Sequence, residues 1–161
     1  MPIKQKHPKT NVIRILENKR IPHQVLVYDP SDGRIDALSV AGKLGEAPEN
    51  LFKTLVGRSE EGVVVFCIPG PAELDLKKAA RAAGAKKVEL VAVKELLPLT
   101  GYVRGGCSPV GMKKAYPLYI DTACTQHEYI VISGGALGVQ VRISPQDLLA
   151  LTGAVQANLC V

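Results

Sequence analysis

Tryptophan is absent from this sequence, and only 4% of its residues are aromatic, so we expect a core of aliphatic side chains. Long apolar runs are missing as well, since none approaches the roughly 20 residues that cross a bilayer. The basic residues 1–7 are not followed by the hydrophobic region of a signal peptide. We therefore expect a cytoplasmic protein with neither a membrane span nor a signal peptide.

Cysteine pairs with metal-binding or redox spacing are also lacking. Cys67, Cys107, Cys124 and Cys160 are far apart and no CxxC occurs, so we expect reduced thiols, mostly buried as small apolar groups. The sequence contains no Walker A loop, no GxGxxG fingerprint, no HExxH and no GxSxG. It therefore predicts neither a metal nor a cofactor.

Length and charge narrow the class of protein further. A chain of 161 residues with 47% hydrophobic and 22% charged residues fits one globular domain, which we expect to span residues 1–161. The net charge is +5 and the pI about 9.1, which permits a polyanionic partner. Because the charge is spread along the chain and not gathered in an arm, a DNA-reading protein is not expected.

Hydrophobic periodicity and turn residues predict a series of short elements. The expected helices cover residues 11–21, 37–44, 76–83 and 145–152, with a helical turn at 93–97 that ends at Pro98. The expected strands cover residues 24–28, 50–58, 63–69, 87–91, 118–121, 129–133 and 139–143, with turns at 59–62 and 133–135. Helices and strands mix without strict alternation, and several strands are linked as hairpins. The sequence therefore predicts an α+β fold with a curved, mixed but largely antiparallel sheet.

A glycine-rich segment at residues 101–114 is the most informative stretch. It contains Gly101, Gly105, Gly106, Cys107, Ser108, Pro109 and Gly111. Glycine lets the backbone approach a ligand closely, while Pro109 locks the chain and biases Ser108 towards an extended shape. The N–H groups of such a loop can converge on an anion or on a carbonyl oxygen. A plain connecting loop is the alternative for these residues taken alone.

Lys53 lies in a strand whose neighbours are mostly apolar. The alternation of residues 51–56 places Lys53 among leucines, with Phe52 and Thr54 on the other face. Lysine is rarely buried without a partner, so one interpretation is an edge-strand lysine whose ammonium reaches water. The other is a cavity lysine that meets a phosphate or hydroxyl group as a fixed positive charge.

Three further polar positions have both structural and functional interpretations. Ser133, before Gly134, is either part of a hairpin turn or the rim of a pocket. Asp147 follows Ser144 by three residues, which is typical of a helix cap. Tyr28 is either an aromatic at the edge of the core or a pocket wall that stacks on a base.

Cys107 is the one cysteine that lies in the glycine-rich segment. No neighbouring histidine or helix N-terminus is evident to lower its pKa, so we do not expect a nucleophilic thiolate. His23 and His127 have no nearby partner pattern, and we interpret both as surface or structural residues.

Several short motifs, taken in order, resemble those of the YbaK family of aminoacyl-tRNA deacylases, which is related to the editing domain of prolyl-tRNA synthetases. The motifs are Phe52-Lys53-Thr54-Leu55, Leu76-Lys77-Lys78-Ala79-Ala80, Gly101-Tyr102 with residues 105–111, Ser133-Gly134-Gly135, and Pro145-Gln146-Asp147-Leu148. The resemblance covers residues 10 to about 153. It implies a partly open, barrel-like mixed sheet with flanking helices.

The resemblance also implies an activity and a set of site residues. The activity is removal of a wrong amino acid from tRNA, typically Cys from tRNA(Pro), with action on Cys-tRNA(Cys) as a further expectation. Lys53 matches the family lysine that binds the terminal-nucleotide end of the tRNA. Residues 105–109 match the family's substrate loop, with Gly105, Gly106 and Ser108 as its catalytic part. Substrate-binding positions are Tyr28, Thr54, Cys107, Pro109, Gly111, Ser133, Gly134 and Asp147. Cys107 departs from the family, in which an aliphatic residue such as isoleucine is expected.

The mechanism implied by the family needs no protein base. The cysteinyl thiolate attacks its own ester carbonyl, and the protein positions the substrate and stabilises the oxyanion. The expected partners are the acceptor end of an aminoacylated tRNA and prolyl-tRNA synthetase, with no DNA and no membrane. The alternatives are a deacylase of Ala-tRNA(Pro) that uses water, a non-catalytic tRNA-binding module, and a small-molecule binding protein.

Overall fold

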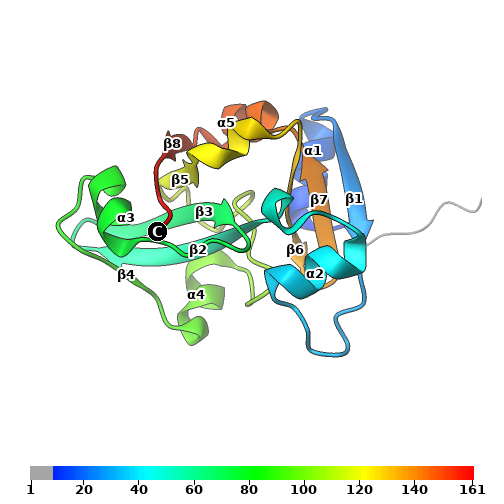
Figure 1. The fold of residues 1–161 in the computed structure, drawn as a ribbon, viewed down its shortest axis with the longest axis horizontal. Coiled ribbons are helices and arrows are strands. Elements are labelled where there is room, and N and C mark those ends of the chain that lie inside the picture. The colour runs from blue at the N-terminus through cyan, green and yellow to red at the C-terminus, as the bar shows by residue number, and fades with distance from the viewer. Residues whose placement is uncertain (1–8) are drawn as a thin grey trace, which may run out of the picture.

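The computed structural model describes residues 9–161, so the interpretation of residues 1–7 lies outside the described residues (Figure 1). Within residues 9–161, no helix is long and apolar enough to cross a membrane. The helices are α1 Asn11–Asn18, α2 Ala37–Leu44, α3 Leu76–Ala83, α4 Leu96–Thr100 and α5 Pro145–Thr152, with short 3-10 helices η1 Pro48–Asn50, η2 Val93–Glu95 and η3 Thr122–Gln126. The strands are β1 His23–Val27, β2 Phe52–Ser59, β3 Gly62–Pro69, β4 Val88–Leu90, β5 Leu118–Asp121, β6 Ile130–Ala136, β7 Val139–Ile143 and β8 Val155–Ala157.

These strands form two sheets, which lie towards opposite ends of the molecule in Figure 1. The first sheet has the order β1-β7-β6 and is antiparallel. The second has the order β4-β2-β3-β5-β8, in which β5 pairs parallel with both β3 and β8. The expected α+β fold with mostly antiparallel pairing is confirmed. The single curved sheet and the partly open barrel are not found, because the strands form two separate sheets that meet at one isolated bridge, Leu51 with Val131.

Helix ends follow the predicted capping residues, except that α1 ends at Asn18, before the limit predicted at Pro22. Thr10 accepts a hydrogen bond from the backbone N–H of Ile13, and Asp75 accepts two from the first turn of α3. Helices α2 and α3 end at Gly45 and Gly84, whose φ values of 68° and 67° are left-handed. These local signals explain why the helices were predictable from sequence.

The structure corrects three expectations about the elements. Helix α4 continues through Pro98, because this residue lies in the first turn, where a backbone N–H has no helical partner. The expected turn at residues 133–135 is part of β6, and the hairpin turn falls at Leu137 and Gly138, where φ is 85°. Strand β8 was not expected, since three residues are too few to show an alternating pattern.

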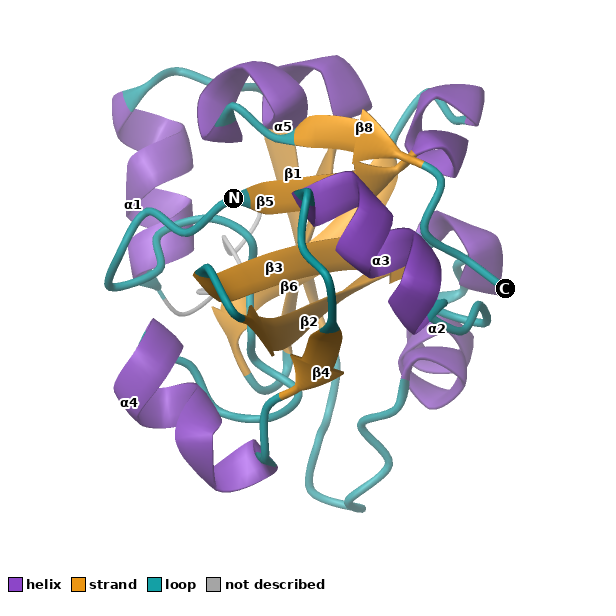
Figure 2. Ribbon diagram, turned by 90° about the vertical axis from the view of Figure 1, so that its left-hand side faces the viewer, coloured by secondary structure: helices purple, strands orange, loops and turns teal. Residues whose placement is uncertain are grey.

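Three apolar clusters explain how the layers pack. Helix α1 contributes Val12, Ile13 and Leu16 to the main cluster, against one face of the three-stranded sheet. Helix α3 covers the five-stranded sheet, as Figure 2 shows, through a second cluster. Helix α2 covers the other face of the three-stranded sheet through a third cluster. The two sheets are joined at the bridge of Leu51 with Val131, and a cavity lies between the start of β2 and helix α2.

Candidate active site

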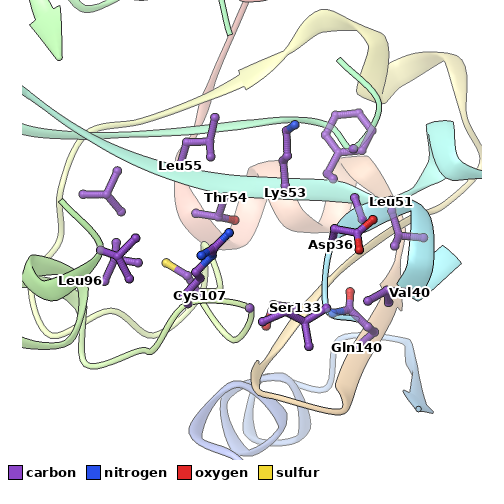
Figure 3. A pocket seen from close by; sticks show the side chains of 18 of the residues that line it. Asp36, Val40, Leu51, Lys53, Thr54, Leu55, Leu96, Cys107, Ser133 and Gln140 are labelled. Atoms are coloured by element: carbon purple, nitrogen blue, oxygen red, sulfur yellow. The ribbon is translucent and has the colours of Figure 1, made fainter. Parts of the chain in front are cut away.

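A cavity of about 750 Å³ lies between the start of β2, helix α2 and the glycine-rich segment (Figure 3). Its lining comes from segments far apart in the sequence: the loop before α2, β2, the segment from Leu90 to Leu96, the glycine-rich segment, and the neighbouring strands β6 and β7. Of the site residues predicted from the sequence, the cavity brings together Lys53, Thr54, Gly105, Cys107 and Ser133. It is the larger of the two best-defined cavities among residues 9–161.

Lys53 lies on β2 at the edge of this cavity. Its side chain leaves the strand on the side opposite to Thr54, as expected for neighbouring strand residues, and points away from Cys107 and Ser133 (Figure 3). No ion pair joins its ammonium group to a carboxylate within residues 9–161. An ammonium placed in this way can meet an anionic group on this side of β2, away from the glycine-rich segment.

The glycine-rich segment offers backbone donors to the cavity. The N–H of Gly106 is already used, because it donates to the carbonyl of Val103 at 2.9 Å. The N–H groups of Gly105 and Cys107 make no hydrogen bond within residues 9–161, and both residues line the cavity. These two amides are therefore available to donate to an oxyanion bound in the cavity.

Close packing explains why glycine is needed at position 105. Its φ of 83° is left-handed, and an added Cβ would lie 2.7 Å from Leu137 Cδ2 and 2.8 Å from Ile35 Cδ1. The loop before α2 and the β6–β7 turn therefore both touch the backbone of this residue. This contact holds three separate segments together around the cavity.

The thiol of Cys107 faces a nearly closed environment, with 8% of the residue exposed. Burial raises the pKa of this thiol to about 11, and a hydrogen bond with Thr100 opposes the increase. At neutral pH it is therefore protonated and a weak nucleophile. All four cysteines are free, and burial likewise raises the pKa of Cys67, Cys124 and Cys160.

Ser108, Pro109 and Gly111 were predicted as site residues but do not line the larger cavity. Ser108 is fully buried, and its hydroxyl accepts a hydrogen bond from the N–H of Val110, which holds the turn. Pro109 and Gly111 line a second, smaller cavity of about 270 Å³ beside α1 and β5. These residues shape the segment but do not line the larger cavity.

The remaining predicted residues also lie outside the lining. Tyr28 is buried, and the ammonium of Lys43 lies 5.6 Å from the centre of its ring. Gly134 is buried in β6, where an added Cβ would lie 2.5 Å from Val139. Asp147 lies in the first turn of α5, and its N–H donates to Ser144, as in a helix cap.

Gln140, Asp36 and Arg104 line the cavity but were not singled out from the sequence. Gln140 lies on β7 directly opposite Ser133 on β6, and it is buried among the strands. The available signal was the alternation of β7, in which Gln140 and Arg142 interrupt Val139, Val141 and Ile143. The position of Gln140 beside the cavity follows from its pairing with Ser133. The sequence predicted a turn at Ser133, so this pairing was not expected.

An apolar wall closes the other end of the cavity. It consists of Leu90, Val91, Val93 and Leu96, for which the sequence suggested no role in a site. Within residues 9–161, no group of three or more His, Cys, Asp or Glu side chains is placed to hold a metal ion.

Comparison with known proteins identifies the family. The model of the aminoacyl-tRNA editing domain matches residues 35–151. The chain is 42% identical over 157 residues to the candidate Cys-tRNA(Pro)/Cys-tRNA(Cys) deacylase EbsC of Enterococcus faecalis, a match that covers 97% of this chain and 96% of that protein. It is 29% identical over 139 residues to a proline–tRNA ligase of Shouchella clausii, covering 86% of this chain and 23% of the ligase.

Solved structures lead to the same assignment. A candidate trans-editing enzyme for prolyl tRNA synthetase superposes with a TM-score of 0.83 and 29% identity, over 96% of this chain and 99% of that one. The resemblance noted in the sequence is thus confirmed over nearly the whole chain, and so is the enzyme class. This chain belongs to the aminoacyl-tRNA editing family of deacylases.

Proposed function

We propose that this chain is a trans-editing deacylase that removes cysteine from mischarged tRNA(Pro) and also acts on Cys-tRNA(Cys). The name of the Enterococcus faecalis relative supports this substrate, and the match to part of a proline–tRNA ligase supports a role beside prolyl-tRNA synthetase. The proposed place of action is the cytoplasm, where tRNA is charged. The proposed site consists of Lys53, Gly105, Cys107 and Ser133, with Thr54 beside them.

One observation carries the proposal: a cavity that offers free backbone donors beside a thiol that stays protonated. The amides of Gly105 and Cys107 are unbonded within residues 9–161, and the Cys107 pKa lies far above neutral pH. Asp36 is the carboxylate in the lining, and its hydrogen bonds with Ser39 lower its pKa, so it is a poor base. Such a site suits a substrate that supplies its own nucleophile.

The proposed reaction starts from the thiol of the cysteinyl ester. Its thiolate attacks the ester carbonyl, a sulfur–carbon bond forms, and the oxyanion accepts hydrogen bonds from the Gly105 and Cys107 amides. The bond from carbon to the ribose oxygen then breaks, the ribose hydroxyl regains a proton, and cysteine leaves as a cyclic thioester that water opens. One well-placed oxyanion donor contributes roughly 3 kcal/mol to such a step.

Lys53 has a separate role in this proposal. Its ammonium points away from the floor of the cavity, so it suits a phosphate of the tRNA end more than the oxyanion. The lysine would then hold the substrate while the glycine-rich segment stabilises the reaction.

The deciding experiment compares three esters on the same tRNA: Cys-tRNA(Pro), its S-methylated form, and Ala-tRNA(Pro). We expect repeated turnover of Cys-tRNA(Pro) and almost none of the other two, because only the first carries a free thiol. Fit alone discriminates such small groups by only about 1–3 kcal/mol. Equal rates on all three would replace the thiol mechanism with attack by water. Tight binding with an intact ester would indicate a tRNA-binding module, and turnover of none would refute the enzyme.

A further inference from the structure

Arg104 is a cationic residue of the glycine-rich segment that has no partner in the fold. It lines the cavity and is exposed, and its guanidinium makes no hydrogen bond or ion pair within residues 9–161. Unpaired arginines are common on protein surfaces, so this alone assigns no role. What distinguishes Arg104 is its place, directly before the unused amide of Gly105.

A tight turn fixes the backbone of Arg104 at the cavity. The carbonyl of Val103 accepts a hydrogen bond from the N–H of Gly106 at 2.9 Å, and Gly105 has a left-handed φ of 83°. This is the pattern of a type II turn with Arg104 at its second position, where proline is common and no charge is required. The neighbouring loops pack closely against Gly105 and hold the turn in place. The fold therefore fixes where this side chain starts but does not account for its charge.

The charged side chains in the lining favour an anion over a cation. They are Asp36, Lys53 and Arg104, so positive charge is in excess among the lining residues. The carboxylate of Asp36 is exposed and already accepts hydrogen bonds from the N–H and the hydroxyl of Ser39. Lys53 points away from Cys107, on the other side of β2 (Figure 3). Among the residues that line the cavity, Arg104 is therefore the cation on the same segment as the oxyanion donors.

The covalent structure of the substrate identifies the anion. An aminoacyl ester is carried on the ribose of the terminal nucleotide, and the nearest negative charge is the phosphate on the 5′ oxygen of the same ribose. With the ester carbonyl at the Gly105 and Cys107 amides, this phosphate lies within one nucleotide of them. A side chain as long as arginine, starting at the residue before Gly105, can reach that far.

We propose that the guanidinium of Arg104 binds the 5′-phosphate of the terminal nucleotide of the tRNA. Arginine suits this role because its planar fork can donate two parallel hydrogen bonds to one phosphate. Lys53, on the other side of β2, is then left for a phosphate further along the tRNA. This inference rests on the proposed function, and it makes Arg104 the residue that aligns the terminal ribose with the oxyanion donors.

The test uses two stable adenosine derivatives that carry cysteine in amide linkage at the 3′ position. One has a free 5′-hydroxyl, and the other has a 5′-phosphate closed as a methyl ester, which carries the single negative charge of a tRNA phosphodiester. Calorimetry with the wild-type protein at low salt is expected to give roughly 5- to 20-fold tighter binding of the phosphate compound, because water weakens an exposed ion pair below the value of a buried one. Equal affinity for the two compounds would overturn the inference.

Four variants assign the preference to this side chain. Arg104→Met keeps much of the length but removes the charge, and it is expected to bind both compounds as the wild type binds the one without phosphate. Arg104→Lys keeps the charge without the fork and should retain part of the preference. Lys53→Met should retain most of it, because that ammonium lies on the other side of β2. Arg81→Met, at an exposed position on α3, is the matched control and should behave like the wild type.

The outcomes separate this inference from the proposed function. A folded Arg104→Met protein that still prefers the phosphate compound, or a preference lost in Lys53→Met instead, would overturn the role of Arg104, whatever the enzyme cleaves. Wild-type protein whose preference depends on Arg104 but which fails to turn over Cys-tRNA(Pro) would instead refute the proposed reaction. Binding of neither compound overturns the inference, and turnover of Cys-tRNA(Pro) by the same protein decides whether the proposed function falls with it. Thermal unfolding of each variant checks the fold, and Arg104→Gln carries the same expectation if Arg104→Met does not fold.

Discussion

Lys53 is either a phosphate-binding residue or a surface lysine, and the two interpretations predict opposite effects of its substitution on activity. If it binds a phosphate, Lys53→Ala should lower kcat/KM by about 100-fold or more. The free energy of unfolding should change by less than about 0.5 kcal/mol, because the ammonium has no ion-pair partner within residues 9–161. Deacylation of Cys-tRNA(Pro) and urea unfolding measure the two quantities. The control is Lys77→Ala, an exposed lysine on α3, and a fully active Lys53→Ala protein would leave only a surface role for this residue.

Cys107 leads to the reverse expectation, since its thiol is not the nucleophile in the proposed reaction. Cys107→Ile should retain turnover of Cys-tRNA(Pro), with an altered preference among substrates because the larger side chain narrows the cavity. The pH dependence supplies a second readout. The substrate thiol, with an ordinary pKa near 8.5, must lose its proton to attack, so the rate should rise about tenfold per pH unit below that value and level off above it.

The pH at which the rate levels off distinguishes the two thiols. Cys107 has a pKa of about 11, so its ionisation would extend the rise well beyond pH 9. We therefore expect the same profile for the wild type and for Cys107→Ile. Loss of all turnover in a folded Cys107→Ile protein would refute substrate assistance in this chain.

At the scale of elements, β6 is the strand whose irregularity shapes the site. Its regular register against β7 ends with Ser133 opposite Gln140, and the register then shifts between Ser133 and Ala136. Gly134 lies within the shifted stretch, packed so closely that a Cβ would meet Val139 Cγ1 at 2.5 Å. A glycine is thus required here by contact with the neighbouring strand.

Gly134→Ala should therefore destabilise the protein by about 1–3 kcal/mol, the usual cost of overpacking. The control is Gly42→Ala in α2, where no atom lies within 4 Å of the added Cβ. That change should stabilise the protein by about 0.5–1 kcal/mol, because alanine favours a helix more than glycine does. Urea unfolding of both variants measures the difference. A stability of Gly134→Ala equal to that of the wild type would show that the strand relaxes around the added carbon.

The elements also show what the sequence could predict and what it could not. Helices with a cap at each end, such as α3 between Asp75 and Gly84, carry their limits in a few adjacent residues. The bulge in β6 is not visible in the local sequence, because Ser133-Gly134-Gly135 is equally suited to a turn. Only pairing with β7 decides between a turn and a bulged strand. Strand β8 depends on β5 for its pairing, so its three residues carry no signal of their own.

The same reasoning applies to the candidate site. Lys53 and residues 105–107 stood out because a charge among apolar residues and a cluster of glycines are visible locally. Gln140 became visible only through the cross-strand register, and Asp36 only through the packing of α2 beside β2. The expected pocket position Asp147 matched a helix cap equally well, and a cap is where the structure places it.

At the scale of the whole molecule, the charge predicts how the protein meets tRNA. The net charge of +5 is modest and spread over the chain, so we expect contact with the acceptor end and few other phosphates. A single-stranded end contributes a slope of about 0.7 in log affinity against log salt for each phosphate contacted. Two to four contacts therefore predict a slope between roughly −1.5 and −3. Fluorescence anisotropy with labelled tRNA(Pro), over a range of salt concentrations, measures it.

Two comparisons make this prediction specific to the proposed site. A minihelix containing only the acceptor stem should bind nearly as well as the whole tRNA, because the cavity is the proposed centre of contact. Lys53→Ala should reduce the slope by about 0.7, the value for one phosphate, whereas Lys77→Ala should leave it unchanged. An affinity independent of salt would contradict phosphate binding. A whole tRNA that binds far more tightly than the minihelix would place the main contact outside the cavity, and the basic residues elsewhere on the surface would then carry the recognition of tRNA.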